Sequence, residues 1–135
     1  MEVTLQYRGG VAFEIEARGH RIICDQPREN HGEDAGFTPP ELLLASLAAC
    51  AGYYAVEYLK TRGLPAEGVE VHVVSTKALK PARLSDFQIE IAVPDIDERH
   101  EEGVRRAVKA CLIHNTLLNP PSIETVVRVA AKSQA

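Results

Sequence analysis

The three cysteines of this 135-residue sequence, Cys24, Cys50 and Cys111, are the residues whose side chains offer the clearest chemistry. A thiolate is a nucleophile and a metal ligand, and it can be oxidised reversibly to a sulfenic acid or a disulfide. Because the cysteines are odd in number and far apart, with no C-x-x-C pair, they indicate neither a secreted disulfide framework nor a zinc site. In a reducing compartment such thiols are either inert core residues or reactive groups.

Cys50 lies in a long apolar run, from Leu42 to Val56, in which no polar face develops before Glu57 and Lys60. This composition is typical of a helix that is apolar on every side, and such a helix must be covered on every side. A chain of this length with one sheet cannot supply that cover alone. The run therefore predicts a buried central helix and a homodimer.

The long helix has sequence signals at both ends. Thr38 and Glu41 bracket two prolines in a capping-box pattern, because the threonine can accept a hydrogen bond from the amide three residues on and the glutamate can reach back. The helix is predicted from Glu41 to about Thr61, and Gly63 ends it. Glu41 is interpreted as the cap, with a catalytic carboxylate as the alternative.

Cys111 follows a second predicted helix, from Asp95 to about Ala110. Its apolar residues recur at spacings of three and four, which places them on one face; they are Val104, Ala107, Val108 and Cys111. A short helical piece over 112–118 comes next and is stopped by Asn119-Pro120-Pro121. If Cys111 has no partner thiol, it is interpreted as an ordinary core residue on the apolar face of this helix.

Alternating apolar and polar residues predict strands on both sides of the long helix. Arg8-Gly9-Gly10 supplies a turn, and the polar residues 27–37 form a loop of a length that is often functional. The predicted strands cover residues 3–7, 11–17, 20–26, 69–73, 87–93 and 123–130. We therefore expect a single α+β domain, residues 1–135, with antiparallel sheets around the long helix.

Composition excludes several classes of protein. The chain has 45% hydrophobic and 25% charged residues and a net charge of −4, which is an ordinary globular mixture. Its largest basic cluster, Arg105-Arg106 with Lys109, is too small for a nucleic-acid-binding stripe. No apolar run reaches the ~18–20 residues that cross a bilayer, and no signal peptide is evident. We expect a cytoplasmic protein that binds neither nucleic acid nor membrane.

The order of these elements, together with the stretch TPPELLLASLAAC that ends at Cys50, resembles the OsmC/Ohr family (osmotically inducible protein C and organic hydroperoxide resistance protein). The resemblance covers nearly the whole chain, and a second cysteine at position 111 strengthens it. It implies an intertwined α+β homodimer with the central helices packed between sheets. It also implies a peroxidase that uses neither a metal nor an organic cofactor.

The resemblance assigns roles to two cysteines. Cys50 would be the peroxidatic residue, which attacks a hydroperoxide as the thiolate and becomes a sulfenic acid. Cys111 would be the resolving residue, which condenses with that acid to form a disulfide. A dithiol reductant would then restore both thiols. This chemistry requires a depressed thiol pKa, an apolar pocket and a partner thiol within bridging distance.

The sequence departs from the peroxidase pattern in the residues that would activate the thiol. Peroxidase members carry a glutamate ten positions before the first cysteine, where it holds an arginine against the thiolate, but here that position is Pro40. Glu41 falls on the opposite side of the helix from Cys50 at ~100° per residue. Arg28, in the polar loop, is the arginine considered for this role. Leu112 stands where those peroxidases have proline.

Each candidate residue also has a structural interpretation. Cys50 can be a small hydrophobic core residue among alanines and leucines, and Cys24 is interpreted as part of a strand in the core. His31 and His114 have no neighbour at ligand spacing and are interpreted as solvated or hydrogen-bonded. The rival to a peroxidase is a non-enzymatic protein of the same fold that binds a small apolar ligand or senses redox state.

Overall fold

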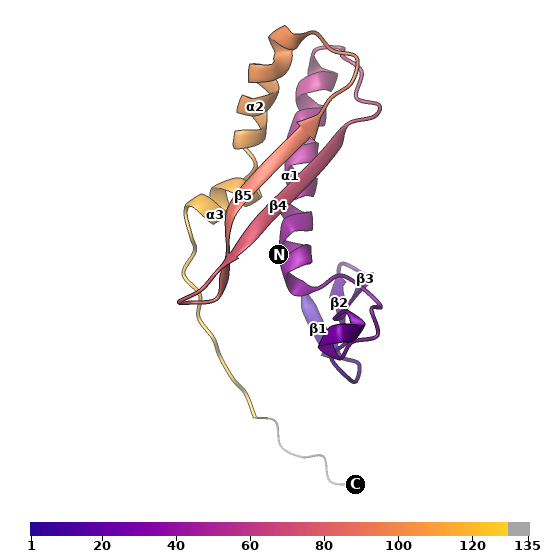
Figure 1. Cartoon of the computed structure of the whole chain (residues 1–135), viewed down its shortest axis with the longest axis vertical. Coiled ribbons are helices and arrows are strands. Elements are labelled where there is room, and N and C mark those ends of the chain that lie inside the picture. Colours follow the sequence, from indigo (N-terminus) through magenta and orange to yellow (C-terminus); the bar gives the residue numbers. More distant parts are fainter. Residues whose placement is uncertain (130–135) are drawn as a thin grey trace.

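The computed structural model describes residues 1–129 and shows one long helix between two separate antiparallel sheets (Figure 1). The first sheet has the order β1-β2-β3 and lies at the N-terminal end of the helix α1. The second is the hairpin β4–β5, which lies along the rest of α1. The elements are β1 (Thr4–Tyr7), β2 (Phe13–Ala17), β3 (His20–Cys24), η1 (Arg28–Asn30), α1 (Pro39–Thr61), β4 (Glu70–Ala78), β5 (Arg83–Ala92), η2 (Glu98–His100), α2 (Glu101–Lys109) and α3 (Leu112–Leu118). The expected α+β class is confirmed.

The first sheet is the predicted meander. Ile15 of β2 pairs with Leu5 of β1 and with Ile22 of β3, so apolar side chains stand beside one another across the three strands. At the β1–β2 turn, Gly9 and Gly10 adopt φ values of +98° and +56°, which only glycine adopts without strain. Each strand is slightly shorter than the alternation predicted.

The loop from β3 to α1 is organised around the buried side chain of Asp25, which is 1% exposed. Its carboxylate accepts hydrogen bonds from the backbone amides of Gln26 (2.8 Å), Glu33 (3.1 Å) and Ala35 (3.1 Å). The amide of Gln26 does most to lower the pKa of Asp25, against the opposing effect of burial. The loop also packs closely enough that a Cβ on Gly32 would overlap the carbonyl group of Gln26. The polar segment is therefore a compact structure.

Helix α1 begins at the predicted capping box. The Thr38 hydroxyl accepts a hydrogen bond from the Glu41 amide (3.4 Å), and the Glu41 carboxylate accepts one from the Thr38 amide (2.9 Å). Pro39 occupies the first helical position, where the missing amide hydrogen costs nothing. At the other end, Gly63 has a φ of +67° and donates its amide hydrogen to the carbonyl of Lys60. Both boundaries follow the sequence signals.

Within one chain, α1 buries a single stripe of its surface. The stripe consists of Leu47, Ala51, Ala55 and Leu59, which are four residues apart. Other apolar side chains of the helix stay accessible, and Tyr53 is 62% exposed. Within residues 1–129, the chain therefore leaves much of the surface of α1 uncovered, as the sequence led us to expect.

By length and composition alone, α1 could also span a membrane. An 18-residue window has a mean hydropathy of 1.4, and 22% of that window is buried. This corrects the expectation that no run of the chain is long and apolar enough. The core helix of a soluble protein meets the same criterion.

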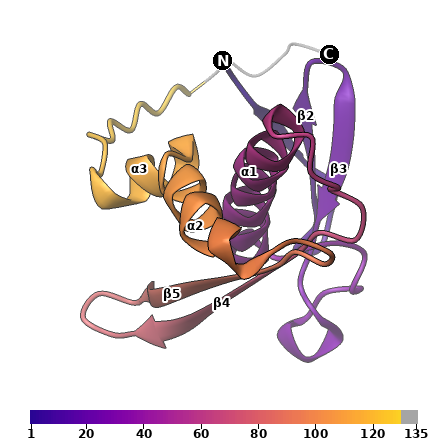
Figure 2. The ribbon, with the colours of Figure 1, turned by 90° about the horizontal axis from the view of Figure 1, so that it is seen from above.

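The main core lies where α1 and α2 meet the β4–β5 hairpin (Figure 2). Its buried members are Ala51, Ala55, Leu59, Val104 and Val108. Val71 and Ile91 pair across the hairpin and pack against this cluster. Gly103 allows α2 to approach Tyr58 of α1, because a Cβ there would overlap the phenol ring. The core thus fixes α2, and with it the position of Cys111.

Two predicted elements differ from the structure. The helix expected over 95–110 becomes regular only at Glu101, because residues 95–97 have extended or left-handed backbone and Asp97 caps η2 by accepting the Arg99 amide hydrogen (2.9 Å). The strand expected over 123–130 does not form among residues 120–129, and Ala130 lies outside the described residues. A strand needs a neighbouring edge to bond with, and these residues contact no edge within the chain.

The buried carboxylate of Asp25 makes a prediction about acid stability. Because its pKa is lowered in the folded chain, its stabilisation is present above the unfolded pKa of about 3.9 and is lost as the pH falls through the folded value. Asp25→Asn should therefore lower the free energy of unfolding at pH 7, and the difference from wild type should shrink between pH 5 and pH 3. Urea denaturation at fixed protein concentration measures this, with Glu67→Gln as an exposed control. A difference that stays constant with pH would contradict the role assigned to Asp25.

Candidate functional site

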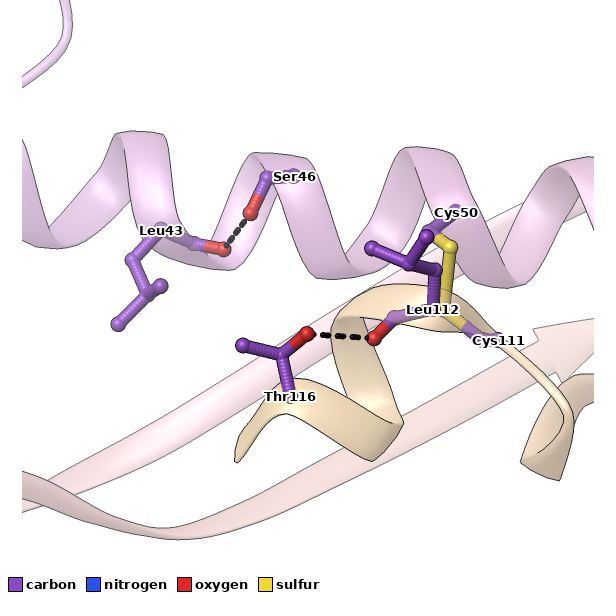
Figure 3. Close-up of a disulfide and its surroundings, with 6 residues drawn as sticks. All are labelled: Leu43, Ser46, Cys50, Cys111, Leu112 and Thr116. Carbon is purple, nitrogen blue, oxygen red and sulfur yellow. Dashed lines mark hydrogen bonds between the residues drawn. A yellow bond between two sulfur atoms is a disulfide. The ribbon is translucent and has the colours of Figure 1, made fainter. Parts of the chain in front are cut away.

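Cys50 and Cys111 form a disulfide in the structure (Figure 3). Their Cα atoms are 5.9 Å apart, although 61 positions separate the two residues in the sequence. This is within the ~7 Å limit for a disulfide without backbone movement. Of the three cysteines, only Cys24 is free. The fold therefore joins the two thiols that the sequence singled out.

Helix α1 and the α2–α3 junction position the two sulfur atoms. Cys50 lies midway along α1, on a face next to the buried stripe. Cys111 has an extended backbone (φ −57°, ψ 131°) between two helices. Its amide donates to the carbonyl of Val108 (3.1 Å), and its carbonyl accepts from the amide of Asn115 (3.0 Å). Because both neighbouring helices hold the backbone of Cys111, its sulfur faces α1 in a fixed position.

The two cysteines differ in accessibility. Cys111 is completely buried, whereas Cys50 is only half-buried. The side chains of Leu112 and Leu43 lie on the same side of α1 as the disulfide in Figure 3. A reagent from solvent can therefore reach Cys50 first, beside apolar side chains. Attack on Cys111 would require movement of the α2–α3 junction.

The hydroxyl groups near the disulfide are already engaged with their own helices. Ser46 donates to the carbonyl of Leu43 (2.8 Å), and Thr116 donates to the carbonyl of Leu112 (2.8 Å). Among residues 1–129, no hydrogen bond or ion pair joins a donor or a cation to either sulfur atom. Residues 1–129 thus bring the two thiols together without a hydrogen-bond donor at either sulfur.

The residues considered for that stabilisation lie elsewhere. Glu41 is committed to the capping box, where the Thr38 amide, and then the Thr38 hydroxyl, lower the pKa of the Glu41 carboxyl. Its interpretation as a cap is confirmed. Arg28 lies exposed in η1, and its side chain forms no hydrogen bond or ion pair within the described part of the chain. It is available to a second molecule.

Cys24 occupies a different environment. Its side chain is 4% exposed at the end of β3, and burial followed by the negative charge of Asp25 raises the pKa of its thiol. A thiol with a raised pKa is a poor nucleophile. The interpretation of Cys24 as a core residue is confirmed.

The two histidines considered as metal ligands or bases lie in different environments. His31 is exposed in the loop after η1, with a left-handed backbone. His114 is half-buried in α3, and its Nδ1 atom is buried without a hydrogen-bond partner. Among residues 1–129, no group of three His, Cys, Asp or Glu side chains is placed to hold a metal ion. The expectation that His114 is solvated or hydrogen-bonded was wrong for Nδ1.

Comparison with known proteins places this geometry in a family. The family model described as OsmC-like protein matches residues 31–126. A structure from Psychrobacter arcticus, described as a putative osmotic stress induced and detoxification response protein, has a TM-score of 0.77 at 22% identity and covers 84% of this chain and 85% of its own. An OsmC-like protein from Mycoplasma pneumoniae has a TM-score of 0.73 at 21% identity and covers 88% and 87%.

Hydroperoxide resistance proteins have the same fold. The organic hydroperoxide resistance protein OhrB of Bacillus subtilis has a TM-score of 0.61 at 20% identity, covering 88% of this chain and 90% of its own. At such identities the similarity establishes the fold alone. No curated protein sequence matches the chain. The predicted fold, with antiparallel sheets around a long central helix, is confirmed.

Proposed function

We propose that this chain, which belongs to the family of OsmC-like proteins, is a homodimeric thiol peroxidase that reduces organic hydroperoxides through Cys50 and Cys111. The observation that carries the proposal is the pairing of these two residues across the fold, with a half-buried sulfur facing a fully buried one. Structural relatives described as organic hydroperoxide resistance proteins support the same activity.

The proposed reaction needs two sulfur atoms in sequence. The Cys50 thiolate attacks the outer oxygen of a hydroperoxide; the O–O bond breaks, and the alkoxide leaves as an alcohol after taking a proton. Cys50 is then a sulfenic acid. The Cys111 thiolate attacks the Cys50 sulfur, an S–S bond forms, and the hydroxyl group leaves as water with one proton. A dithiol reductant returns both cysteines to thiols and becomes a disulfide itself.

The geometry favours this order of steps. Cys50 is the sulfur that a hydroperoxide can reach, beside the apolar side chain of Leu112. Cys111 is sealed from solvent at a Cα separation of 5.9 Å, so it can capture the sulfenic acid without a large movement. Rapid capture matters because further oxidation of an uncaptured sulfenic acid is irreversible.

A second subunit supplies what one chain lacks. An ordinary cysteine has a pKa of about 8.5, and apolar surroundings raise it, so a nearby cation is needed near neutral pH. No side chain donates a hydrogen bond to the Cys50 sulfur within residues 1–129, and Arg28 is exposed on a compact loop. In the proposed dimer, Arg28 of one subunit approaches Cys50 of the other. Reduction by a dithiol also favours a reducing compartment, and we place the protein in the cytoplasm.

Exposed apolar side chains support the dimer. They occur on the first sheet, on the open face of α1, and in the extended segment after α3. They include Val3, Leu5, Tyr7, Ile22, Ile23, Leu43, Tyr53, Ile123, Val126, Val127 and Val129. A surface this apolar is characteristic of an interface. A second copy would cover α1 and give residues 123–129 a strand edge to bond with.

A second candidate function follows from the lack of a hydrogen-bond donor at the disulfide. Because no side chain donates a hydrogen bond to either sulfur within the described residues, the disulfide could serve as a redox sensor without peroxidase turnover. In that case a dithiol would reduce the disulfide, but the reduced protein would not consume hydroperoxide catalytically.

Peroxide turnover distinguishes the two candidates. With tert-butyl hydroperoxide and excess dithiothreitol, the wild type should consume many equivalents of peroxide per subunit. Cys50→Ser should fall to the rate without protein, because no other thiol is positioned for attack. Cys111→Ser should react once and then accumulate over-oxidised Cys50, detected by mass spectrometry. Cys24→Ser is the matched control and should retain wild-type turnover. Equal rates for wild type and Cys50→Ser would refute the proposal and leave the sensor.

The dimer makes a separate prediction. Light scattering at micromolar concentration should give twice the chain mass of 14.8 kDa. Val127→Asp should shift the equilibrium toward monomer, because it places a charge in the apolar segment that is expected to pair with the second subunit. Ser122→Asp adds the same charge in the same segment at a polar position and should leave the dimer intact. A monodisperse wild-type monomer would remove the proposed interface.

A further inference from the structure

A groove of about 620 Å³ lies between β5 and α2. Ligand pockets commonly measure ~300–1,000 Å³. Its apolar lining comes from alternate residues of β5 and the residue after it, and from the inner face of α2: Phe87, Ile89, Ile91, Val93, Val104 and Val108. Neither Cys50 nor Cys111 contributes to this β5–α2 groove.

We propose that the β5–α2 groove binds an aliphatic carboxylate, with the hydrocarbon chain along β5 and the carboxylate held by Lys109 and His114. This site is separate from the proposed peroxidase site and does not depend on it. It follows from a long apolar floor, a charge gradient along α2 and an unpaired histidine ring that meet in one cavity.

The floor of the groove suits an extended apolar molecule. Phe87 and Val93 are six residues apart in an extended segment, and at about 3.3 Å per residue they span roughly 20 Å. The side chains between them are half-buried, since α2 packs against α1 and leaves the edge of β5 open. An alkyl chain that lies on these side chains removes apolar surface from water on both partners.

The charges of the rim orient the ligand. Helix α2 runs back along β5, as Figure 1 shows, so its acidic start and basic end lie at opposite ends of the groove. Glu98 and Glu101 line the acidic end and would repel a carboxylate. At the basic end, Arg105 is already paired with Glu101 and Glu102. Lys109 makes no ion pair within residues 1–129, which leaves it available for an anion.

His114 adds a donor at the same end. It lines the groove, and its ring makes no hydrogen bond within the described residues. Its Nδ1 atom is buried without a hydrogen-bond partner. A ring N–H of His114 can donate to a carboxylate that also contacts Lys109, forming a charge-assisted hydrogen bond.

A second copy of the chain is a poorer occupant of this groove. The centre of a protein–protein interface is depleted of charged residues, but five charged side chains line this cavity: Asp97 and Glu98 at η2, and Glu101, Arg105 and Lys109 of α2. The exposed apolar surfaces assigned to the dimer lie on the first sheet, α1 and the segment after α3. The groove is therefore expected to stay open in the dimer.

Calorimetric titration of the intact reduced protein with hexanoate, octanoate and decanoate tests the proposal. We expect saturable binding of one ligand per chain, with an affinity that rises roughly two- to fourfold per added methylene. Lys109→Gln should weaken decanoate binding at least about fivefold and leave decanol binding unchanged, because only the anion needs the cation. Arg106→Gln, a cation of the same helix outside the groove, is the matched control and should bind decanoate like the wild type.

Three results would overturn the proposal. One is the absence of saturable binding up to millimolar decanoate. Another is equal weakening of decanoate binding by Lys109→Gln and Arg106→Gln, which would indicate general attraction by positive charge. The third is conversion of a dimer to a monomer by Phe87→Glu, which would show that a second copy fills the groove. Peroxide turnover is measured separately, so failure here leaves the proposed peroxidase unaffected.

Discussion

Apolar cover for helix α1 is the requirement on which the other features of this protein depend. The helix has apolar residues on every side, yet a single chain buries only the stripe formed by Leu47, Ala51, Ala55 and Leu59. The β4–β5 hairpin and α2 cover this stripe, and in doing so they bring the α2–α3 junction against α1. Cys111 lies at that junction, so the packing that stabilises the helix also brings the second thiol to Cys50. In the proposed dimer, a second subunit covers the remaining faces of the same helix.

The same burial creates a chemical conflict at Cys50. Apolar surroundings allow an organic hydroperoxide to approach, but they disfavour the thiolate that must attack it. In this chain Pro40 stands where the related peroxidases have a glutamate, and Glu41 caps the helix. Within residues 1–129 no side chain donates a hydrogen bond to the Cys50 sulfur, so in the proposed peroxidase the activating cation comes from a second subunit. The compact loop built on Asp25 holds the exposed Arg28 in a defined structure, which lowers the entropy cost of presenting it to a partner.

Most of the fold could be predicted from the sequence because local signals dominate it. The capping box at Thr38 and Glu41, the glycines of the β1–β2 turn and the alternation in both hairpins each specify a structure over a few residues. The strand expected over 123–130 is the main failure, since its residues alternate as in a strand but no strand pairs with residues 120–129 in the described part of the chain. The pairing of Cys50 with Cys111 was predicted from the family resemblance and not from local sequence signals. The groove between β5 and α2 was not predicted from the sequence, because the pattern of its residues indicates only the core-facing sides of a strand and a helix.

The pH dependence of Cys50 alkylation tests most directly whether this residue is an activated nucleophile. The measurement uses a variant in which Cys24 and Cys111 are serine, so that only one thiol reacts with iodoacetamide. An ordinary cysteine ionises with a midpoint near 8.5. We predict a midpoint below about 7.5, as expected for a thiolate stabilised by a cation from the second subunit. A midpoint above about 9 would show a thiol that burial has made inert, and it would contradict the proposed peroxidase.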